Sequence, residues 1–527
     1  MRFNPKAFIP KENRWFSPKV EYSGQAVATF PRTGSSLTGF AKFKYSELGV
    51  ATVQFSPNRS SAGSTVLLRP HEPVTVEIST DEYTFSVEDA IYLGGGNWRA
   101  YRGQYSVNGA GSAKYWVLPL INLISGFEQI EDHLDNHPLR IFPKNVVIPD
   151  CLPAAQRETA TDFANSKNYL IVFYFRNHLG FIEPVADYEK KKAKLESGEK
   201  HALTALMIGE IPADRVAKQI NFDQVHKWLP RKQLLSLLGI STGFEVSNSW
   251  IEFRDEHGNL VKRLHAQFGL PEFSQGHAAL WEEYHPGSTG KLLSLVRVSS
   301  PRKNAIINNA LEYILKGAKV SRPPLEDRYR NVCIAANMLY DAFGYGQVKL
   351  IDQLPDKASI RIRNSKERLL KTIQSVEKHK SKKDPDVSEA LTIIIDRISK
   401  EHLFEDNHFG RALKRLISSR KFNFPDANIL ASHTLKTSSA RRKVWLDAIY
   451  QFRNLVMHQG YFDFPSKQDR SEVLSATQHM LDICLRVVFK ELGYDGMYMP
   501  SVMGASGTKP LDWVSGESTP TDLGYRI

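Results

Sequence analysis

Cysteine is scarce in this chain, since only three of its 527 residues are cysteines. Cys151, Cys333 and Cys484 lie far apart, show no Cys-x-x-Cys spacing, and are odd in number. This pattern excludes a disulfide scaffold and argues against a thiolate zinc cluster. It favours a reducing compartment.

Long apolar runs are missing as well. The most apolar stretches, residues 115–127 and 169–175, are shorter than the ~20 residues that span a bilayer. The first six residues, MRFNPK, carry charge with no apolar region behind them, so we expect no signal peptide. We therefore expect a cytoplasmic protein without a membrane partner.

Basic side chains outnumber acidic ones. Lys and Arg number 69 against 57 Asp and Glu, which gives a net charge of +12. Such an excess permits RNA, DNA or a membrane surface as partner without choosing between them. Residues 351–450 alone hold 21 Lys and Arg against 13 Asp and Glu. The basic residues there that could follow RNA phosphates, or simply form solvated loops, are Lys378, Lys380, Lys382, Lys383, Arg441, Arg442 and Lys443.

The first 299 residues are predicted to be rich in β-structure. Between residues 26 and 116, short runs of Val, Thr, Phe and Tyr are broken by Gly, Pro, Asn and Ser, as is typical of antiparallel strands. The continuous apolar run 169–175 predicts a strand buried on both faces. Residues 244–261 predict a hairpin that turns at Asp255-Glu-His-Gly-Asn259. This region could split into two near residues 150–160.

Helical spacing begins near Pro301, and we assign residues 300–495 to an α-helical bundle and 496–527 to a loosely held tail. Pro323-Pro324 can start a helix, and Gly344, Gly460 and Gly493 can each end one. Three apolar stripes precede these glycines. They are Leu325, Tyr329, Val332, Ala336, Leu339 and Phe343; Trp445, Ile449, Phe452 and Val456; and Val473, Thr477, Met480, Cys484 and Val487. The chain is thus predicted to be an α+β protein of several domains.

A polar trio, Arg453, Asn454 and His458, stands in the helix predicted to end at Gly460. If Phe452 faces the core, Asn454 and His458 share a face that points away from it, and Arg453 flanks that face. Two copies packed around this face would bring two Arg and two His into one cleft. The residues alone fit equally well a surface Arg and a capping His on a structural helix.

Such a cleft suits cleavage of an RNA phosphodiester without a metal ion. A His can take a proton from the 2′-hydroxyl or give one to the leaving 5′-oxygen, and an Arg can neutralise charge on the phosphorane. The spacing is weak evidence, because about three chance Arg-x(4–6)-His matches are expected in a chain of this composition. One other match, Arg397 to His402, lacks an Asn after the Arg and a Gly after the His.

The pattern Phe452-Arg-Asn-x-x-x-His458-x-Gly460, followed by a long helix over residues 467–492, resembles the second half of HEPN domains. Known active members of that family are metal-independent endoribonucleases whose twofold dimer forms the active cleft. The resemblance implies that Arg453, Asn454 and His458 are the catalytic residues. A Glu often found in the family's early core helix is absent here, where the sequence is Ala335-Ala-Asn337.

The architecture as a whole resembles the Apea-like HEPN proteins, which carry a large β-rich region before the HEPN domain. Residues 234–263 are similar to a recurring stretch of that region. The resemblance implies a homodimeric endoribonuclease that leaves 2′,3′-cyclic phosphate and 5′-hydroxyl ends. It further implies tRNA as a candidate substrate, a role in anti-phage defence by abortive infection, and a phage-derived trigger sensed by residues 1–299. The alternative is a non-catalytic dimerisation or RNA-binding module with a protein-recognition region.

Three other motifs give weaker indications of function. His133 and His137 have a metal-ligand spacing on a helix, but no third ligand stands out and Pro138 follows. Gly94-Gly-Gly96 lacks a phosphate-binding fingerprint, and the segment 287–291 has His285 and Leu292 where a P-loop needs Gly and Ser or Thr. We expect no metal and no cofactor.

Overall fold

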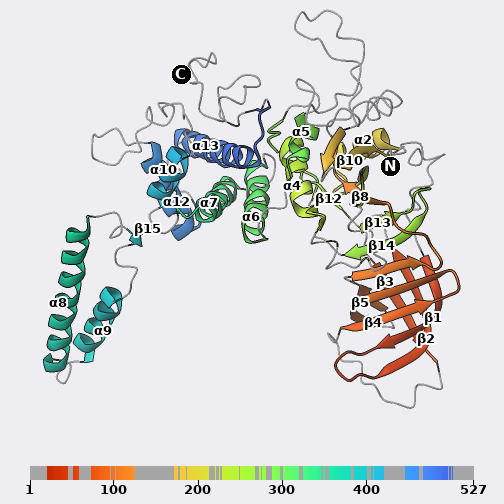
Figure 1. Ribbon diagram of the computed structural model, residues 1–527, viewed down its shortest axis with the longest axis horizontal. Helices are drawn as coiled ribbons and strands as arrows, with labels where there is room; N and C mark the ends of the chain where they lie inside the picture. The colour runs from red at the N-terminus through yellow and green to blue at the C-terminus, as the bar shows by residue number, and fades with distance from the viewer. Residues whose placement is uncertain are drawn as a thin grey trace, which may run out of the picture. The chain divides into compact units, whose positions relative to one another are not determined.

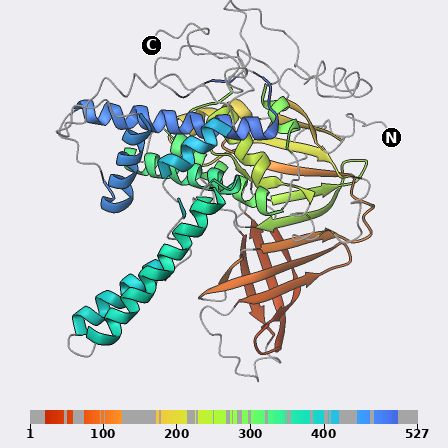
Figure 2. The ribbon, with the colours of Figure 1, turned by 60° about the vertical axis from the view of Figure 1, so that its left-hand side comes forward.

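The fold is given by a computed structural model (Figures 1 and 2). It describes residues 21–45, 51–58, 73–94, 97–100, 102–124, 171–175, 178–185, 187–212, 220, 225, 228–248, 250–266, 272–274, 276–280, 288–296, 301–319, 324–345, 348–349, 355–380, 385–399, 405–406, 409–419, 445–461, 467–496, 498–499 and 501. A β-rich amino-terminal region is followed by a helical carboxy-terminal region, so the α+β class is confirmed. None of the helices described in these ranges is long and apolar enough to cross a membrane.

The chain divides into two compact units. The first contains residues 1–304, 314–324 and 488–511, and the second contains residues 305–313, 325–487 and 512–527. The first unit carries a large antiparallel sheet. Its strands are β1 (Glu21–Thr29), β2 (Ser36–Tyr45), β3 (Ala51–Pro57), β4 (Val74–Ser79), β5 (Tyr83–Gly94), β6 (Asn97–Ala100), β7 (Arg102–Val107), β8 (Tyr115–Ile121), β9 (Ile171–Phe175), β10 (His178–Pro184), β11 (Leu203–Glu210), β12 (Ser247–Asn248), β13 (Trp250–Arg254) and β14 (Leu260–Ala266).

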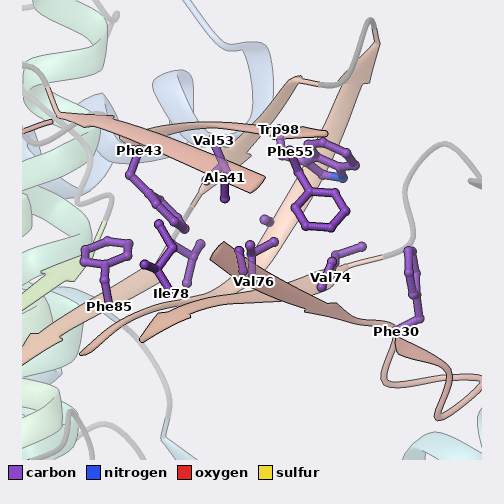
Figure 3. Close-up of a cluster of buried hydrophobic side chains, with 14 residues drawn as sticks. Phe30, Ala41, Phe43, Val53, Phe55, Val74, Val76, Ile78, Phe85 and Trp98 are labelled. Carbon is purple, nitrogen blue, oxygen red and sulfur yellow. The ribbon is translucent and has the colours of Figure 1, made fainter. Parts of the chain in front are cut away.

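The first strands of this sheet close into a ring. The sheet order is β4-β1-β2-β3-β6-β5-β7-β14-β13-β8-β11-β10-β9, and an additional pairing joins β4 to β5. Alternate side chains of each strand point inward, as Val74, Val76 and Ile78 do along β4. They meet Phe43 and Phe85 from other strands in a cluster of buried apolar side chains (Figure 3). Burial of each such side chain contributes about 1.5–3 kcal/mol.

The rest of the sheet is more deeply buried. Every residue of the central strand β8 is buried, although Pro119 cannot donate a ladder hydrogen bond. On one side of β8, pairing with β13 ends at Val117 and pairing with β12 begins at Leu120, so Pro119 lies opposite this break. The predicted buried strand is confirmed as β9, and the predicted hairpin as β13–β14. This unit also contains the helices α2 (Tyr188–Glu196), α4 (Arg231–Thr242) and α5 (Ser288–Ser294).

A buried ion cluster holds the β13–β14 hairpin together. One oxygen of the Glu252 carboxylate accepts hydrogen bonds from Arg263 Nε at 3.0 Å and Trp250 Nε1 at 2.9 Å, and the other pairs with Arg254. Burial alone would raise the pKa of Glu252, but the two guanidinium charges outweigh it and lower that pKa. Arg254 Nη1 also donates to Gly258 O at 2.8 Å, which ties the turn to the strands.

The described members of the three apolar stripes are buried, except Leu325 and Phe343 at the ends of the first stripe, which are half-buried. Gly344, Gly460 and Gly493 end their helices with positive φ angles of 75°, 82° and 76°. The helices are α6 (Pro301–Ala318), α7 (Leu325–Ala342), α8 (Asp356–Lys380), α9 (Pro385–Ser399), α10 (Phe409–Ser419), α12 (Trp445–Gln459) and α13 (Lys467–Leu492), with a short pair of strands, β15 (Val348–Lys349) and β16 (Glu405–Asp406). Helices α7, α10 and α12 pack against one another.

The segment expected to be a loose tail is packed where the structure describes it. Tyr498 is fully buried. The backbone N–H of Met499 donates to Ala279 O at 2.6 Å, and its carbonyl lies 2.9 Å from the His277 ring. Composition alone could not anticipate these contacts, because they join residues far apart in the sequence.

Candidate functional site

Helix α12 carries the polar trio and is held by its apolar stripe. Ile449, Phe452 and Val456 recur at helical spacing and are all buried. The N–H of Gly460 donates to Val456 O at 3.0 Å, and its left-handed backbone stops the helix there. The trio therefore occupies the last two turns of α12.

Helix α7 fixes the position of α12 through Tyr329. The phenol of this fully buried residue donates a hydrogen bond to Ile449 O at 2.6 Å. Its ring meets Phe452 edge-on, with 6.3 Å between the ring centroids. Burial raises the pKa of Tyr329 well above its usual value, so the phenol keeps the proton that it donates.

The Arg453 side chain lies against α10. Its guanidinium carbon is 5.2 Å from the centroid of the Phe409 ring, which is a cation–π contact. Arg453 Nη1 donates to Asn454 Oδ1 at 3.3 Å. Arg453 Nε is buried and has no hydrogen-bond partner among the residues that the structure describes. The Arg453 guanidinium is therefore partly buried in the helical unit, and its hydrogen bond to Asn454 helps to fix its orientation.

This geometry differs from the outward display expected from helix spacing. Arg453 and Asn454 are both half-buried, and the exposed side chains of this part of α12 are Leu455, Met457 and Gln459. For Arg453 the reason is α10, whose Phe409 ring lies against the guanidinium. His458 lies one turn beyond Asn454 in the backbone of α12, and its side chain is outside the described part of the structure.

A further aromatic residue, Tyr340, extends the surroundings of Arg453. The Tyr340 ring lies 6.0 Å from the Phe409 ring, nearly perpendicular to it. Its hydroxyl donates to Asn337 Oδ1 at 2.7 Å. Burial raises the pKa of Tyr340 to about 12, while the charge of Arg453 acts in the opposite direction. A continuous series of contacts therefore runs from Asn337 through Tyr340 and Phe409 to Arg453.

A second arginine meets the end of α12. Arg330 of α7 donates from Nη2 to Gly460 O at 3.3 Å, and its Nη1 bonds Asp327 at 3.0 Å. A cation at this end of a helix is favourable, because the last carbonyl groups carry partial negative charge. Arg330 therefore contacts the carboxy-terminal end of α12, whereas the Arg453 guanidinium lies against α10.

The sequence did not single out Tyr340, Phe409 or Arg330. Tyr340 could have been found, because it stands four residues after the core residue Ala336. Phe409 lies on a different helix with no spacing relation to Arg453, so only the tertiary contact identifies it.

The other candidates are placed as follows. Lys378 is exposed on α8, and the backbone of Lys380 ends that helix. Lys382, Lys383, Arg441, Arg442 and Lys443 lie outside the described residues, as do His133 and His137. Ser288 to Lys291 belong to helix α5, and Lys291 Nζ pairs with Asp495 at 2.5 Å. Within the described ranges no three His, Cys, Asp or Glu side chains are grouped closely enough to hold a metal ion.

Comparison of the chain with models of protein families, with curated proteins and with solved structures found no match.

Proposed function

We propose that the helical region is a metal-independent endoribonuclease of the HEPN type, with Arg453, Asn454 and His458 as its catalytic residues. The observation that carries the proposal is the Arg453–Asn454 pair, which lies one turn before His458 on the capped helix α12. The sequence resemblance to HEPN domains supports the same assignment. Arg330 adds a second guanidinium group near the end of this helix.

The reaction is an internal transesterification. One His458 takes the proton of the 2′-hydroxyl, whose oxygen forms a bond to phosphorus. The bond from phosphorus to the 5′-oxygen breaks, and a second protonated His458, supplied by a twofold-related copy, gives that oxygen a proton. Arg453 stabilises the phosphorane charge, and Asn454 orients the guanidinium. The products are a 2′,3′-cyclic phosphate and a 5′-hydroxyl.

The biological setting of the proposal is defence of a bacterial cytoplasm against phage. The β-rich region would sense a phage-derived trigger, and the helical region would then cut RNA, with tRNA as the first substrate to test. Such a nuclease would stop translation and end the infection with the death of the host cell. Both the trigger and the defence role rest on the resemblance stated above.

The test is to induce the full chain in bacterial cells, with and without phage infection, and to map fragments of total RNA and tRNA. The wild type should produce discrete fragments with cyclic phosphate ends, and His458→Ala should produce none. The matched control is His402→Ala, which removes the histidine of the other Arg-x(4–6)-His pair and should leave cleavage unchanged. Equal cleavage by wild type and His458→Ala would overturn the proposal.

A second candidate function is a non-catalytic dimerisation or RNA-binding module. It is favoured by the contact between Arg453 and Phe409, because a guanidinium packed on a buried ring also serves as a structural contact. The variant Arg453→Lys distinguishes the two candidate functions. The ammonium keeps the charge but not the planar fork, so a nuclease should lose most of its rate while the fold persists. A purely structural module should cleave no RNA in either form.

A further inference from the structure

Helix α8 presents a continuous basic stripe that the proposed catalytic site does not use. Seven exposed residues recur along it at spacings of four and three, which places them on one face. They are Lys357, Arg361, Asn364, Arg368, Lys371, Ser375 and Lys378. We call this face the basic ridge. Its five cations and two neutral polar residues extend over about 30 Å at 1.5 Å per residue.

The opposite face of α8 packs on α9, and the two helices lie side by side in both views (Figures 1 and 2). Glu377 accepts a hydrogen bond from Thr392 of α9 at 3.2 Å. Ile362, Leu370 and Ile373 share this half-buried face with it. The ridge lies roughly 150° around the helix from Glu377, so the packing between α8 and α9 leaves it open.

The residue types on α8 limit the class of ligand that the basic ridge can bind. A single acidic residue, Glu367, borders it one turn before Lys371, whereas Asp356 and Glu377 lie at other angles on α8. The helix also contains no Phe, Tyr or Trp on which an unpaired base could stack. A row of cations can contact phosphates, but without aromatic side chains it offers no surface on which unpaired bases can stack, so it favours a duplex, whose bases stack on one another, over a single strand.

We propose that the basic ridge of α8 binds the phosphate backbone of base-paired RNA. The choice of RNA rests on the proposed function, whereas the choice of a duplex backbone rests on the ridge itself. By this assignment Lys378 belongs to a phosphate-binding face, together with four cations that the density of charge along the sequence did not single out. The ridge would hold a stem of the substrate without reading its sequence.

The test measures binding by the full chain, with His458→Ala present throughout so that the proposed cleavage cannot occur. The probes are an RNA hairpin of about 20 base pairs, an unstructured RNA of equal length, a DNA duplex of equal sequence, and vesicles that contain phosphatidylserine. The ridge variant combines Arg361→Gln, Arg368→Gln and Lys371→Gln. The matched control combines Arg32→Gln, Lys44→Gln and Arg470→Gln, which removes three exposed cations outside α8.

The ridge variant should bind the RNA hairpin at least about tenfold more weakly than its parent. The slope of log affinity against log salt should fall by about two to three. The control variant should keep the affinity within about twofold, and both should keep the oligomeric state of the parent. Equal binding by the ridge variant and its parent would overturn the proposal. Tighter binding of the parent to the unstructured RNA, the DNA or the vesicles would overturn it too.

The two proposals fail separately. If cleavage depends on His458 but the ridge variant binds RNA as tightly as its parent, the ridge proposal fails and the nuclease proposal stands. If binding of the RNA hairpin depends on the ridge but the wild type cleaves no RNA, the nuclease proposal fails and phosphate binding by the ridge stands.

Discussion

The Arg453 guanidinium rests on the ring of Phe409, with 5.2 Å between its central carbon and the ring centroid. This contact joins α12 to α10 and directs the side chain inward. It also gives Arg453 a defined position, which the proposed role in stabilising a phosphorane requires. The coupling free energy between Arg453 and Phe409 can be measured directly.

A double-mutant cycle over Arg453→Met and Phe409→Leu should yield a coupling free energy of about 0.5–2 kcal/mol, because each change removes one partner of the cation–π contact. The measurement is the free energy of unfolding of wild type, both single variants and the double variant in urea. A parallel cycle that pairs Arg453→Met with the surface change Lys194→Gln should give additivity within about 0.5 kcal/mol. Additivity in the first cycle would mean that the contact stabilises nothing.

Replacing Gly460 by Ala should lower the free energy of unfolding of the helical unit by about 1–2 kcal/mol. The φ angle of this residue is +82°, and a Cβ there would meet open space, so the cost comes from the backbone alone. Gly111→Ala is the matched control. Its Cβ would also meet open space, but its φ lies outside the left-handed range. Hydrogen exchange of α12 amides should rise only in the first variant.

Glu252→Gln should destabilise the β-rich unit by roughly 3–5 kcal/mol, because it leaves Arg254 and Arg263 buried without a compensating charge. The exposed neighbour Glu256 is the control, and Glu256→Gln should change stability by less than about 0.5 kcal/mol. Because the pKa of Glu252 is lowered in the folded protein, its contribution should be complete above its usual value of 4.5 and lost as pH falls below it. Urea unfolding at several pH values measures both effects.

The stability of the helical unit should fall as pH drops from 6.5 to 4. Burial lowers the pKa of His479 from 6.5 to about 4, so the unfolded chain binds a proton in this range that the folded chain does not. The loss should reach about 3 kcal/mol. In His479→Gln this part of the pH dependence should vanish, whereas the neighbouring exposed change Arg470→Gln should leave it intact. An identical slope in wild type and His479→Gln would contradict the assignment.

Much of the local structure was predictable. The apolar stripes of α7, α12 and α13 and their terminal glycines indicated these helices, because helical period and left-handed glycine are properties of neighbouring residues. The short runs of Val, Thr, Phe and Tyr broken by turn residues indicated strands for the same reason. The closure of the β1–β6 strands into a ring was not predictable, since the β1–β4 and β3–β6 pairings join strands that lie far apart in the sequence.

The sequence by itself determined which residues share a helix with Arg453 and where that helix ends. Tertiary structure alone decided where the guanidinium lies, because Phe409 approaches it from another helix. The ion cluster depends on both, since the sequence predicted the hairpin that carries Glu252 and Arg263, whereas only the structure gives the strand register that places Arg263 Nη2 2.8 Å from Glu252 Oε1. The spacing of apolar residues predicts which side chains share one face of a helix or strand. Contacts between distant segments form only on folding, when packing removes the surfaces of both segments from water.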